Sequence, residues 1–165
     1  MSVIIRPMQP ADLDDAKRVI LSVAAPMFGP DDPEGFIARW WTLLTDVDDW
    51  PRVYGPPRGT FLVALDGERF IGTGAIRPLD ETTAELKRLW LLEAYHGRGI
   101  GYRITQELLA FARAAGYQRV WLITDRVEQG RAIRFYERLG FHDIPPYNDS
   151  EDTMFMELLL SPEEK

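Results

Sequence analysis

The chain has 165 residues, 45% of them hydrophobic and 27% charged, with a formal net charge of -7. This size and composition favour one globular domain over residues 1–165, and the negative charge argues against a nucleic-acid partner, which needs a basic surface. No apolar run approaches the ~18 residues of a membrane span and the N-terminus lacks a signal-peptide layout, so we expect a cytoplasmic protein with no membrane partner.

The first third of the chain predicts a strand, a helix and an irregular segment. Residues 2–8 form a short apolar run, and apolar residues then recur at helical spacing over 13–20. Residues 28–57 are rich in proline, tryptophan and aspartate. This composition predicts a short helix over 33–44 and otherwise a long loop.

A hairpin and a third strand follow. Two β-rich runs in GTFLVALDGERFIGTGAIRPL meet at Asp66-Gly67, a dipeptide typical of tight hairpin turns. The run AELKRLWLL, residues 84–92, predicts the next strand. That strand leads directly into a glycine-rich stretch, HGRGIG, at residues 96–101.

The second half alternates helices and strands. An amphipathic pattern follows the glycine-rich turn and ends at Gly116, where a C-terminal cap belongs. RVWLITD predicts a buried strand, a second helix ends at Gly140, and two more strands close the chain. The expected order βα(α)βββαβαββ is an α/β fold, and its ligand site is expected where the strand before the glycine turn ends.

The glycine-rich turn has the features of a phosphate site. The first turn of a helix exposes backbone N–H groups at the positive end of the helix dipole, and glycines let a ligand approach closely. Four basic side chains and one acidic side chain lie between residues 87 and 103, which makes a local positive spot in an acidic chain. The alternative is that the glycines serve only the turn geometry and the arginines face water.

Other motifs fail on spacing. A dinucleotide fingerprint that starts at Gly97 would end at Tyr102, and the residues after Gly101 are not the Lys-Ser/Thr pair of a P-loop. The two histidines, His96 and His142, lack zinc-ligand spacing, so no metal is expected. With no cysteine and no G-x-S-x-G elbow, thiolate and serine nucleophiles are also excluded.

What remains resembles the GNAT superfamily, the Gcn5-related N-acetyltransferases. Their coenzyme A pyrophosphate signature is Q/R-x-x-G-x-G/A, and HGRGIG matches it except at His96. AIRFYERLGF, residues 132–141, resembles the second signature of the family, at the expected distance along the chain. The resemblance implies an α/β (α+β) acyl-CoA N-acyltransferase fold, with a mixed, mostly antiparallel sheet of about seven strands flanked by about four helices.

The resemblance also implies acetyl-CoA as co-substrate, with its pyrophosphate on the amides of the turn. The pantetheine arm would lie against the backbone of Leu91 and Leu92, and the Leu91 N–H would donate to the thioester carbonyl. His96 in place of Gln or Arg either shifts the phosphate contact or makes it depend on pH. The cofactor-binding residues implied are Leu91, Leu92, Glu93, His96, Gly97, Arg98, Gly99, Ile100, Gly101, Tyr102 and Gln129.

Two residues are candidates for the chemistry. Tyr136 matches the family tyrosine thought to protonate the departing thiolate, although a tyrosine at this spacing is also typical of a core aromatic. Glu85 matches the glutamate base of Gcn5-type histone acetyltransferases. It is equally placed for a salt bridge with Lys87, and Glu93 or ordered water are the alternative bases.

The acceptor site of such enzymes lies between the first helical region, the loop before the last strand and the end of the fourth strand. Trp40 and Tyr54, with the aspartates of residues 31–49, are candidates for an aromatic and acidic pocket that binds a cationic amine. The alternative is that the tryptophans pack the loop and the aspartates are solvated or cap helices. Tyr147, in the loop at 144–153, is a third candidate.

The function expected from this resemblance is transfer of an acetyl group from acetyl-CoA to a primary amine, by direct nucleophilic attack through a ternary complex. The alternatives are a non-catalytic acyl-CoA-binding sensor module and an interaction domain whose coenzyme A site has decayed. The expected partners are acetyl-CoA and an amine, and homodimers are common in families of this kind.

Overall fold

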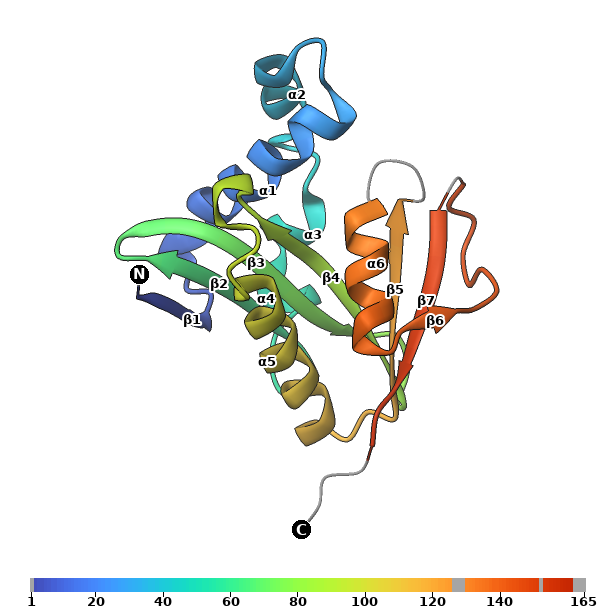
Figure 1. Cartoon of the computed structure of the whole chain (residues 1–165). Helices are drawn as coiled ribbons and strands as arrows, with labels where there is room; N and C mark the ends of the chain where they lie inside the picture. Colours follow the sequence, from blue (N-terminus) through green and yellow to red (C-terminus); the bar gives the residue numbers. More distant parts are fainter. Residues whose placement is uncertain (1, 126–129, 152, 162–165) are drawn as a thin grey trace.

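A seven-stranded sheet forms the centre of the computed structural model, which describes residues 2–125, 130–151 and 153–161 (Figure 1). The strand order is β1-β2-β3-β4-β5-β7-β6, and every neighbouring pair is antiparallel except β4 and β5. The strands are β1 (Val3–Pro7), β2 (Thr60–Asp66), β3 (Arg69–Pro78), β4 (Thr83–Leu91), β5 (Arg119–Asp125), β6 (His142–Asp143) and β7 (Thr153–Leu159).

Helices cover both faces of this sheet. On one face α1 (Leu13–Phe28), α2 (Pro33–Trp40), α3 (Thr45–Asp48) and α4 (Trp50–Val53) enclose one hydrophobic cluster. On the other face α5 (Ile100–Ala114) and α6 (Gly130–Leu139) enclose a second cluster. Because both faces are covered, β2 is apolar at consecutive positions: Val63 faces the first cluster, and Leu62 and Ala64 face the second. Two short 3-10 helices, Pro10–Asp12 and Glu93–Tyr95, complete the described elements.

The predicted fold class is confirmed, and so are its main turn signals. β2 and β3 form a hairpin in which Gly67 has φ +61, the left-handed conformation that the Asp-Gly pair predicted. At the end of α5, Gly116 has φ +89, and its N–H donates to Arg113 O at 3.0 Å. The next N–H, from Tyr117, donates to Ala112 O at 3.1 Å, which completes a Schellman cap.

The prediction for residues 28–57 needs correction, because the segment is more helical than a long loop. The predicted helix over 33–44 ends at Trp40, and two four-residue helices, α3 and α4, follow it. Local sequence hardly favours these short helices. They are held by burial, since Leu44, Val47 and Tyr54 are 3%, 0% and 1% exposed against the sheet.

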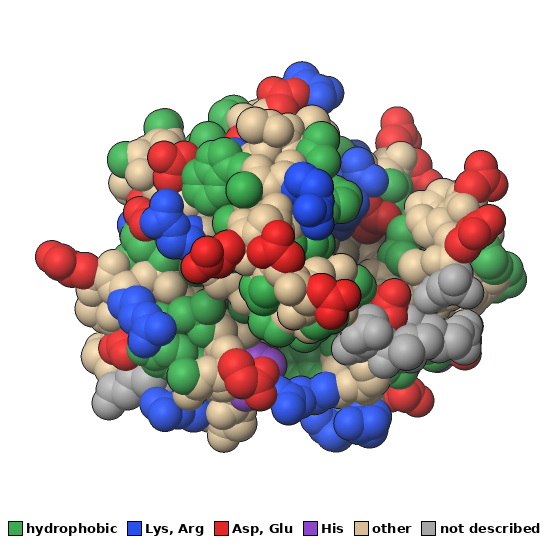
Figure 2. All heavy atoms as spheres, turned by 90° about the horizontal axis from the view of Figure 1, so that it is seen from above, with side chains coloured by type: hydrophobic (Ala, Val, Ile, Leu, Met, Phe, Trp, Pro, Cys, Tyr) green, Lys and Arg blue, Asp and Glu red, His purple; other side chains and the backbone are tan. Residues whose placement is uncertain are grey.

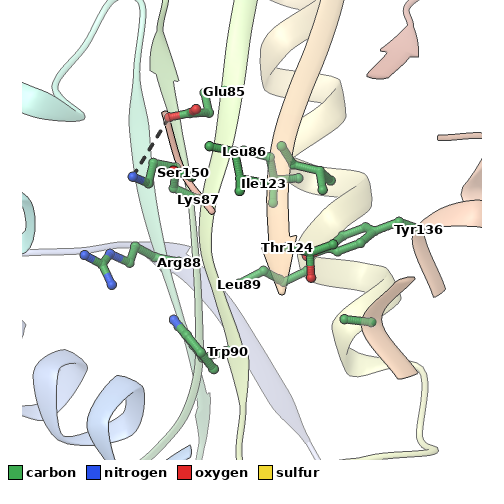
Figure 3. Close-up of a pocket in the computed structure, with 12 residues that line it drawn as sticks. Glu85, Leu86, Lys87, Arg88, Leu89, Trp90, Ile123, Thr124, Tyr136 and Ser150 are labelled. Atoms are coloured by element: carbon green, nitrogen blue, oxygen red, sulfur yellow. Dashed lines mark ion pairs between the residues drawn. The ribbon is translucent and has the colours of Figure 1, made fainter. Parts of the chain in front are cut away.

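A bulge in β4 positions charged side chains for the site. The β3–β4 register shifts between Thr73 and Ala75, and Arg88 adopts φ 58, a left-handed conformation unusual for a residue with a side chain. The Thr73 hydroxyl donates to the Arg88 carbonyl at 2.7 Å, so the displaced backbone keeps a partner. As a result Lys87 and Arg88, although consecutive, both extend to the face covered by α1–α4 (Figure 3).

The parallel strands β4 and β5 separate soon after they begin. Only residues Thr83–Glu85 of β4 pair with β5, at Arg119–Trp121. Beyond these residues the two strands diverge towards their C-terminal ends, and α6 lies beside the gap (Figure 1). This opening lies where the α/β pattern places a ligand. Within the described parts of the chain, no helix has the length and apolar character needed to cross a membrane.

Candidate active site

Two adjoining cavities lie along β4: the smaller is in the gap between β4 and β5, and the larger is at the end of β4, between α1, α5 and α6. The smaller, of about 320 Å³, is lined by β4, by residues 122–124 of β5, by α6 and by Ser150 (Figure 3). The larger, of about 890 Å³, reaches the glycine-rich turn and the start of α5. Four residues line both cavities, so the two meet at this point: Leu89, Trp90, Ala132 and Tyr136. Seen from the open end of the gap, the surface is hollowed between basic and acidic side chains (Figure 2).

The glycine-rich turn presents backbone amides to the larger cavity. Gly97 and Gly99 have φ +78 and +77, which explains glycine at both positions, and Gly99 is the N-cap of α5. The first intrahelical bond runs from Arg103 N–H to Gly99 O, so the amides just before Arg103 have no acceptor within the helix. A Cβ atom on Gly97, Gly99 or Gly101 would meet nothing within 4 Å. The turn is therefore open to an anionic ligand.

The basic side chains around the turn are only partly available to such a ligand. Arg88 pairs with Asp46, and Arg103 donates to Val3 O at 3.1 Å, so two of the four predicted charges serve the fold. Instead, Arg131 and Arg138 of α6 line the larger cavity. Sequence reasoning missed both, although their seven-residue spacing places them on one face of the predicted helix.

Both ring nitrogens of His96 contact other residues of the protein and so hold the glycine-rich turn in place. Its Nε2 lies 2.9 Å from Leu91 O, and its Nδ1 contacts the guanidinium of Arg131, which also bonds Glu93 at 3.2 Å. An arginine only donates, so Nδ1 accepts and the hydrogen-bond network assigns the proton to Nε2, which donates to Leu91. Both ring nitrogens of His96 thus have protein partners, and a phosphate contact of this side chain stays a prediction.

Of the two predicted pantetheine residues, only Leu91 offers its amide to the gap. The Leu92 N–H donates to Ile71 O at 2.9 Å, inside the sheet, and Leu92 lines neither cavity. In an antiparallel pair the backbone groups of consecutive residues point to opposite sides, so the Leu91 N–H points away from β3. On that side β5 has already diverged, which leaves the Leu91 donor directed into the gap.

Tyr136 is packed in the core and also lines the site. Its ring is 7% exposed and packs edge-on against Phe141, as a core aromatic does. It also reaches from α6 towards the gap, where it lines both cavities (Figure 3). Among the described residues its hydroxyl has no hydrogen-bond partner, and burial raises its pKa above the ordinary value for tyrosine. The phenol therefore stays protonated and can act as a proton donor.

Glu85 has a buried carboxylate that lines the smaller cavity and accepts a hydrogen bond at each oxygen. It is 1% exposed, its Oε1 accepts from Arg77 Nε at 2.7 Å, and its Oε2 accepts from the Tyr147 hydroxyl at 2.7 Å. The Lys87 ammonium lies 4.0 Å from the same Oε1. The Tyr147 ring is held by Trp121, with centroids 4.7 Å apart. Glu85 and Tyr147 thus meet, and sequence reasoning missed the contributions of Arg77 and Trp121.

The residues of the predicted acidic and aromatic acceptor pocket mostly have structural partners, which agrees with the alternative that the sequence left open. Tyr54 is 1% exposed in the core, its hydroxyl donates to Asp46, and it lines neither cavity, so its described surroundings do not support a contact with an acceptor. Trp40 is 41% exposed, packs on Phe36 and lines neither cavity. Four of the aspartates have structural partners instead: Asp32 caps α2, Asp46 binds Arg88, Asp48 binds Lys17 and Asp49 binds Arg52.

Most predicted cofactor residues lie together around the larger cavity. Gln129 is outside the described residues, and Arg98 lies 5.5 Å from the centre of the Tyr95 ring without lining either cavity. The predicted cofactor-binding residues that line the larger cavity are Leu91, Glu93, His96, Gly97, Gly99, Ile100, Gly101 and Tyr102.

The Asp46–Arg88 pair yields a stability prediction. Burial opposes ionisation of Asp46, but the hydrogen bonds and charge of Arg88 outweigh it and lower the pKa of Asp46 to about 2. Replacing Asp46 by Asn should therefore lower the free energy of unfolding at neutral pH by about 2 kcal/mol. Because the folded pKa lies below the unfolded one, the wild-type advantage should be complete above about pH 5 and vanish as the pH falls towards 2.

Denaturant unfolding across this pH range measures the difference. The control is Asp49→Asn, since Asp49 pairs with an arginine that is 76% exposed, and its effect should not exceed about 0.5 kcal/mol. A difference for Asp46→Asn that does not depend on pH would show that the ion pair is not its source.

Comparison with known proteins identifies the family. The model of the acetyltransferase (GNAT) family matches residues 22–141, so the chain belongs to this family. N-acetyltransferase 8 of Mus musculus is 37% identical over 105 residues, covering 60% of this chain and 46% of that protein. The chain spans about half the length of several curated relatives that it matches.

Two further matches extend over nearly the whole chain. An uncharacterised N-acetyltransferase of Schizosaccharomyces pombe is 30% identical over 161 residues, covering 92% of this chain and 91% of that protein. The crystal structure of PaiA N-acetyltransferase from Thermoplasma acidophilum, in complex with coenzyme A, has a TM-score of 0.77 at 22% identity, covering 96% of this chain and 99% of that one. The latter similarity shows that the two chains share a fold.

Proposed function

We propose that this protein is an N-acetyltransferase that transfers the acetyl group of acetyl-CoA to a primary amine by direct attack within a ternary complex. The observation that carries the proposal is the gap between the parallel strands β4 and β5, which has open helix amides at one end and Tyr136 at the junction of two cavities. The family membership and the coenzyme A bound by the similarly folded PaiA protein support the same ligand.

Acetyl-CoA would enter along the larger cavity. Its pyrophosphate would accept hydrogen bonds from the amides of residues 98–101, with Arg131 and Arg138 supplying positive charge nearby. The pantetheine arm would follow β4 towards Leu91 and bring the thioester to the junction with the smaller cavity. The cavity volume of about 890 Å³ lies in the range of small-molecule and cofactor sites.

The chemistry needs one donor, one acid and one base. The amine nitrogen attacks the thioester carbonyl carbon, and the Leu91 N–H stabilises the oxyanion of the tetrahedral intermediate. When the carbon–sulfur bond breaks, Tyr136 gives its proton to the departing thiolate. Glu85, directly or through Tyr147 or water, is the candidate that removes the ammonium proton. Glu93 is the weaker candidate, since its side chain is 75% exposed and binds Arg131 beside the glycine turn.

A thiol-release assay tests this function. The full chain is incubated with acetyl-CoA and a panel of primary amines, free coenzyme A is measured, and the acetylated product is identified by mass spectrometry. We expect release above the hydrolysis background for a subset of amines, with product formed in equal amount. Tight binding of acetyl-CoA without turnover of any amine would instead support the non-catalytic sensor module.

A further inference from the structure

Two described carboxylates beside the smaller cavity, those of Glu85 and Asp46, already bind protein donors. Both oxygens of Glu85 accept hydrogen bonds from protein donors, Arg77 and Tyr147. Both oxygens of Asp46 are likewise occupied, by Arg88 at 2.6 and 3.0 Å and by the Tyr54 hydroxyl. Each carboxylate is thus bonded at both oxygens before any substrate arrives.

One cation on the same face has unused donors. The Lys87 side chain is 34% exposed and lines the smaller cavity, yet its ammonium has no hydrogen-bond partner among the described residues. Its nearest carboxylate oxygen, Glu85 Oε1, is 4.0 Å away (Figure 3). By contrast, Arg77 and Arg88 each bond a carboxylate. Lys87 therefore offers up to three N–H donors to whatever enters the cavity.

The charges around Lys87 favour an anion there. Among the residues that the structure describes, the printed ion pairs here join three cations, Arg77, Lys87 and Arg88, to two carboxylates, Glu85 and Asp46. Burial, and then the neighbouring guanidinium groups of Arg77 and Arg88, lower the pKa of Lys87 although Glu85 opposes them. An arriving carboxylate would replace water lost by the partly buried ammonium and balance the excess positive charge.

From this arrangement we propose that the acceptor is a primary amine that also carries a carboxylate, as a free α-amino acid does, and that Lys87 binds this carboxylate in the smaller cavity. The proposal rests on the proposed acetyltransferase function and adds its substrate class. The carboxylate on Lys87 would hold the amine at the junction of the cavities, beside Tyr136. The transfer itself is unchanged: the nitrogen–carbon bond forms, the carbon–sulfur bond breaks, and the amine proton leaves to the base.

Matched acceptors test the substrate class. Each common α-amino acid is compared with its carboxamide and with the amine that lacks the carboxyl group, by thiol release at saturating acetyl-CoA. For the best side chain we expect kcat/KM for the acid to exceed that for the amide by about 10- to 100-fold, the range of one charge-assisted hydrogen bond. Equal rates for acid, amide and amine would overturn the substrate class and leave the acetyltransferase function standing.

Variants of Lys87 test the residue. Lys87→Met should remove the preference for the acid, mainly through KM. Lys87→Arg should restore part of the preference, and Arg52→Met, which removes an exposed cation outside both cavities, should change nothing. A preference that survives in Lys87→Met would overturn the assignment.

A binding measurement separates the two proposals. Calorimetry with free coenzyme A and then the acceptor panel reports ternary complexes without chemistry. We expect the acids to bind the wild-type chain and to lose about 10- to 100-fold in affinity in Lys87→Met. If acetyl-CoA binds but no carboxylate-bearing acceptor either binds or reacts, the acceptor proposal is overturned. If acetyl-CoA itself fails to bind, the proposed function is wrong as well.

Discussion

Replacing Tyr136 by Phe should lower kcat by about 100-fold or more while the affinity for acetyl-CoA stays the same. A positioned general acid contributes on the order of 10²–10⁴ in rate, and the Phe ring keeps the packing against Phe141. Because burial raises the pKa of Tyr136, the acid remains protonated through neutral and mildly alkaline pH, so the ratio of wild-type to variant kcat should stay constant there. Single-turnover kinetics and calorimetry measure the two quantities.

A second tyrosine provides the control for this variant. Tyr117 is 4% exposed, and its hydroxyl donates to Arg58 O at 2.6 Å, so Tyr117→Phe should cost about 1 kcal/mol of stability and leave kcat unchanged. The Tyr136 hydroxyl has no partner among the described residues, and its removal should cost no stability. An unchanged kcat in Tyr136→Phe, under conditions in which chemistry limits turnover, would remove its role as the acid.

Replacing Gly101 by Glu should stabilise the free protein and abolish tight binding of acetyl-CoA. Gly101 lies in the first turn of α5, and a side chain there meets nothing within 4 Å. Glu is a better helix former than Gly and interacts favourably with the helix N-terminus, so the free energy of unfolding should rise by about 1 kcal/mol. The same carboxylate would occupy and repel the pyrophosphate site, so the affinity should fall by about 100-fold or more.

The opposite signs of these two effects make the test specific. Denaturant unfolding gives the stability, and calorimetry gives the affinity. Gly101→Ala is the matched control, because it should also stabilise α5 but leave the affinity within a few-fold of the wild type. If Gly101→Glu binds acetyl-CoA as tightly as Gly101→Ala does, the pyrophosphate does not lie on this turn.

The cofactor side of the site could be predicted from sequence because its signals are local. Gly97 and Gly99 adopt positive φ and Gly116 caps α5, and each of these conformations selects glycine regardless of distant contacts. The amphipathic repeat of α5 has an equally local cause. These elements position the turn and bring several of the predicted cofactor-binding residues to the larger cavity.

The acceptor side could not be predicted because its geometry depends on distant contacts. The bulge at Arg88 puts a non-glycine residue at φ 58, for which the sequence carries no marker. An aromatic and an acidic residue such as Tyr54 and Asp46 are typical of a pocket that binds amines. In the structure, however, tertiary packing buries Tyr54, and Asp46 forms an ion pair with Arg88. The contact between Glu85 and Tyr147 joins residues 62 positions apart, beyond the reach of any periodic pattern.

A thermal melt with and without acetyl-CoA tests most directly whether the gap between β4 and β5 is a coenzyme site. At about 100 times its Kd, a ligand that binds only the folded state adds roughly 2.7 kcal/mol, which for a domain of this size raises Tm by about 5 to 10 °C. We predict a shift of this size for the wild-type chain and for Gly101→Ala. No shift at millimolar acetyl-CoA would contradict the coenzyme site and, with it, the proposed function.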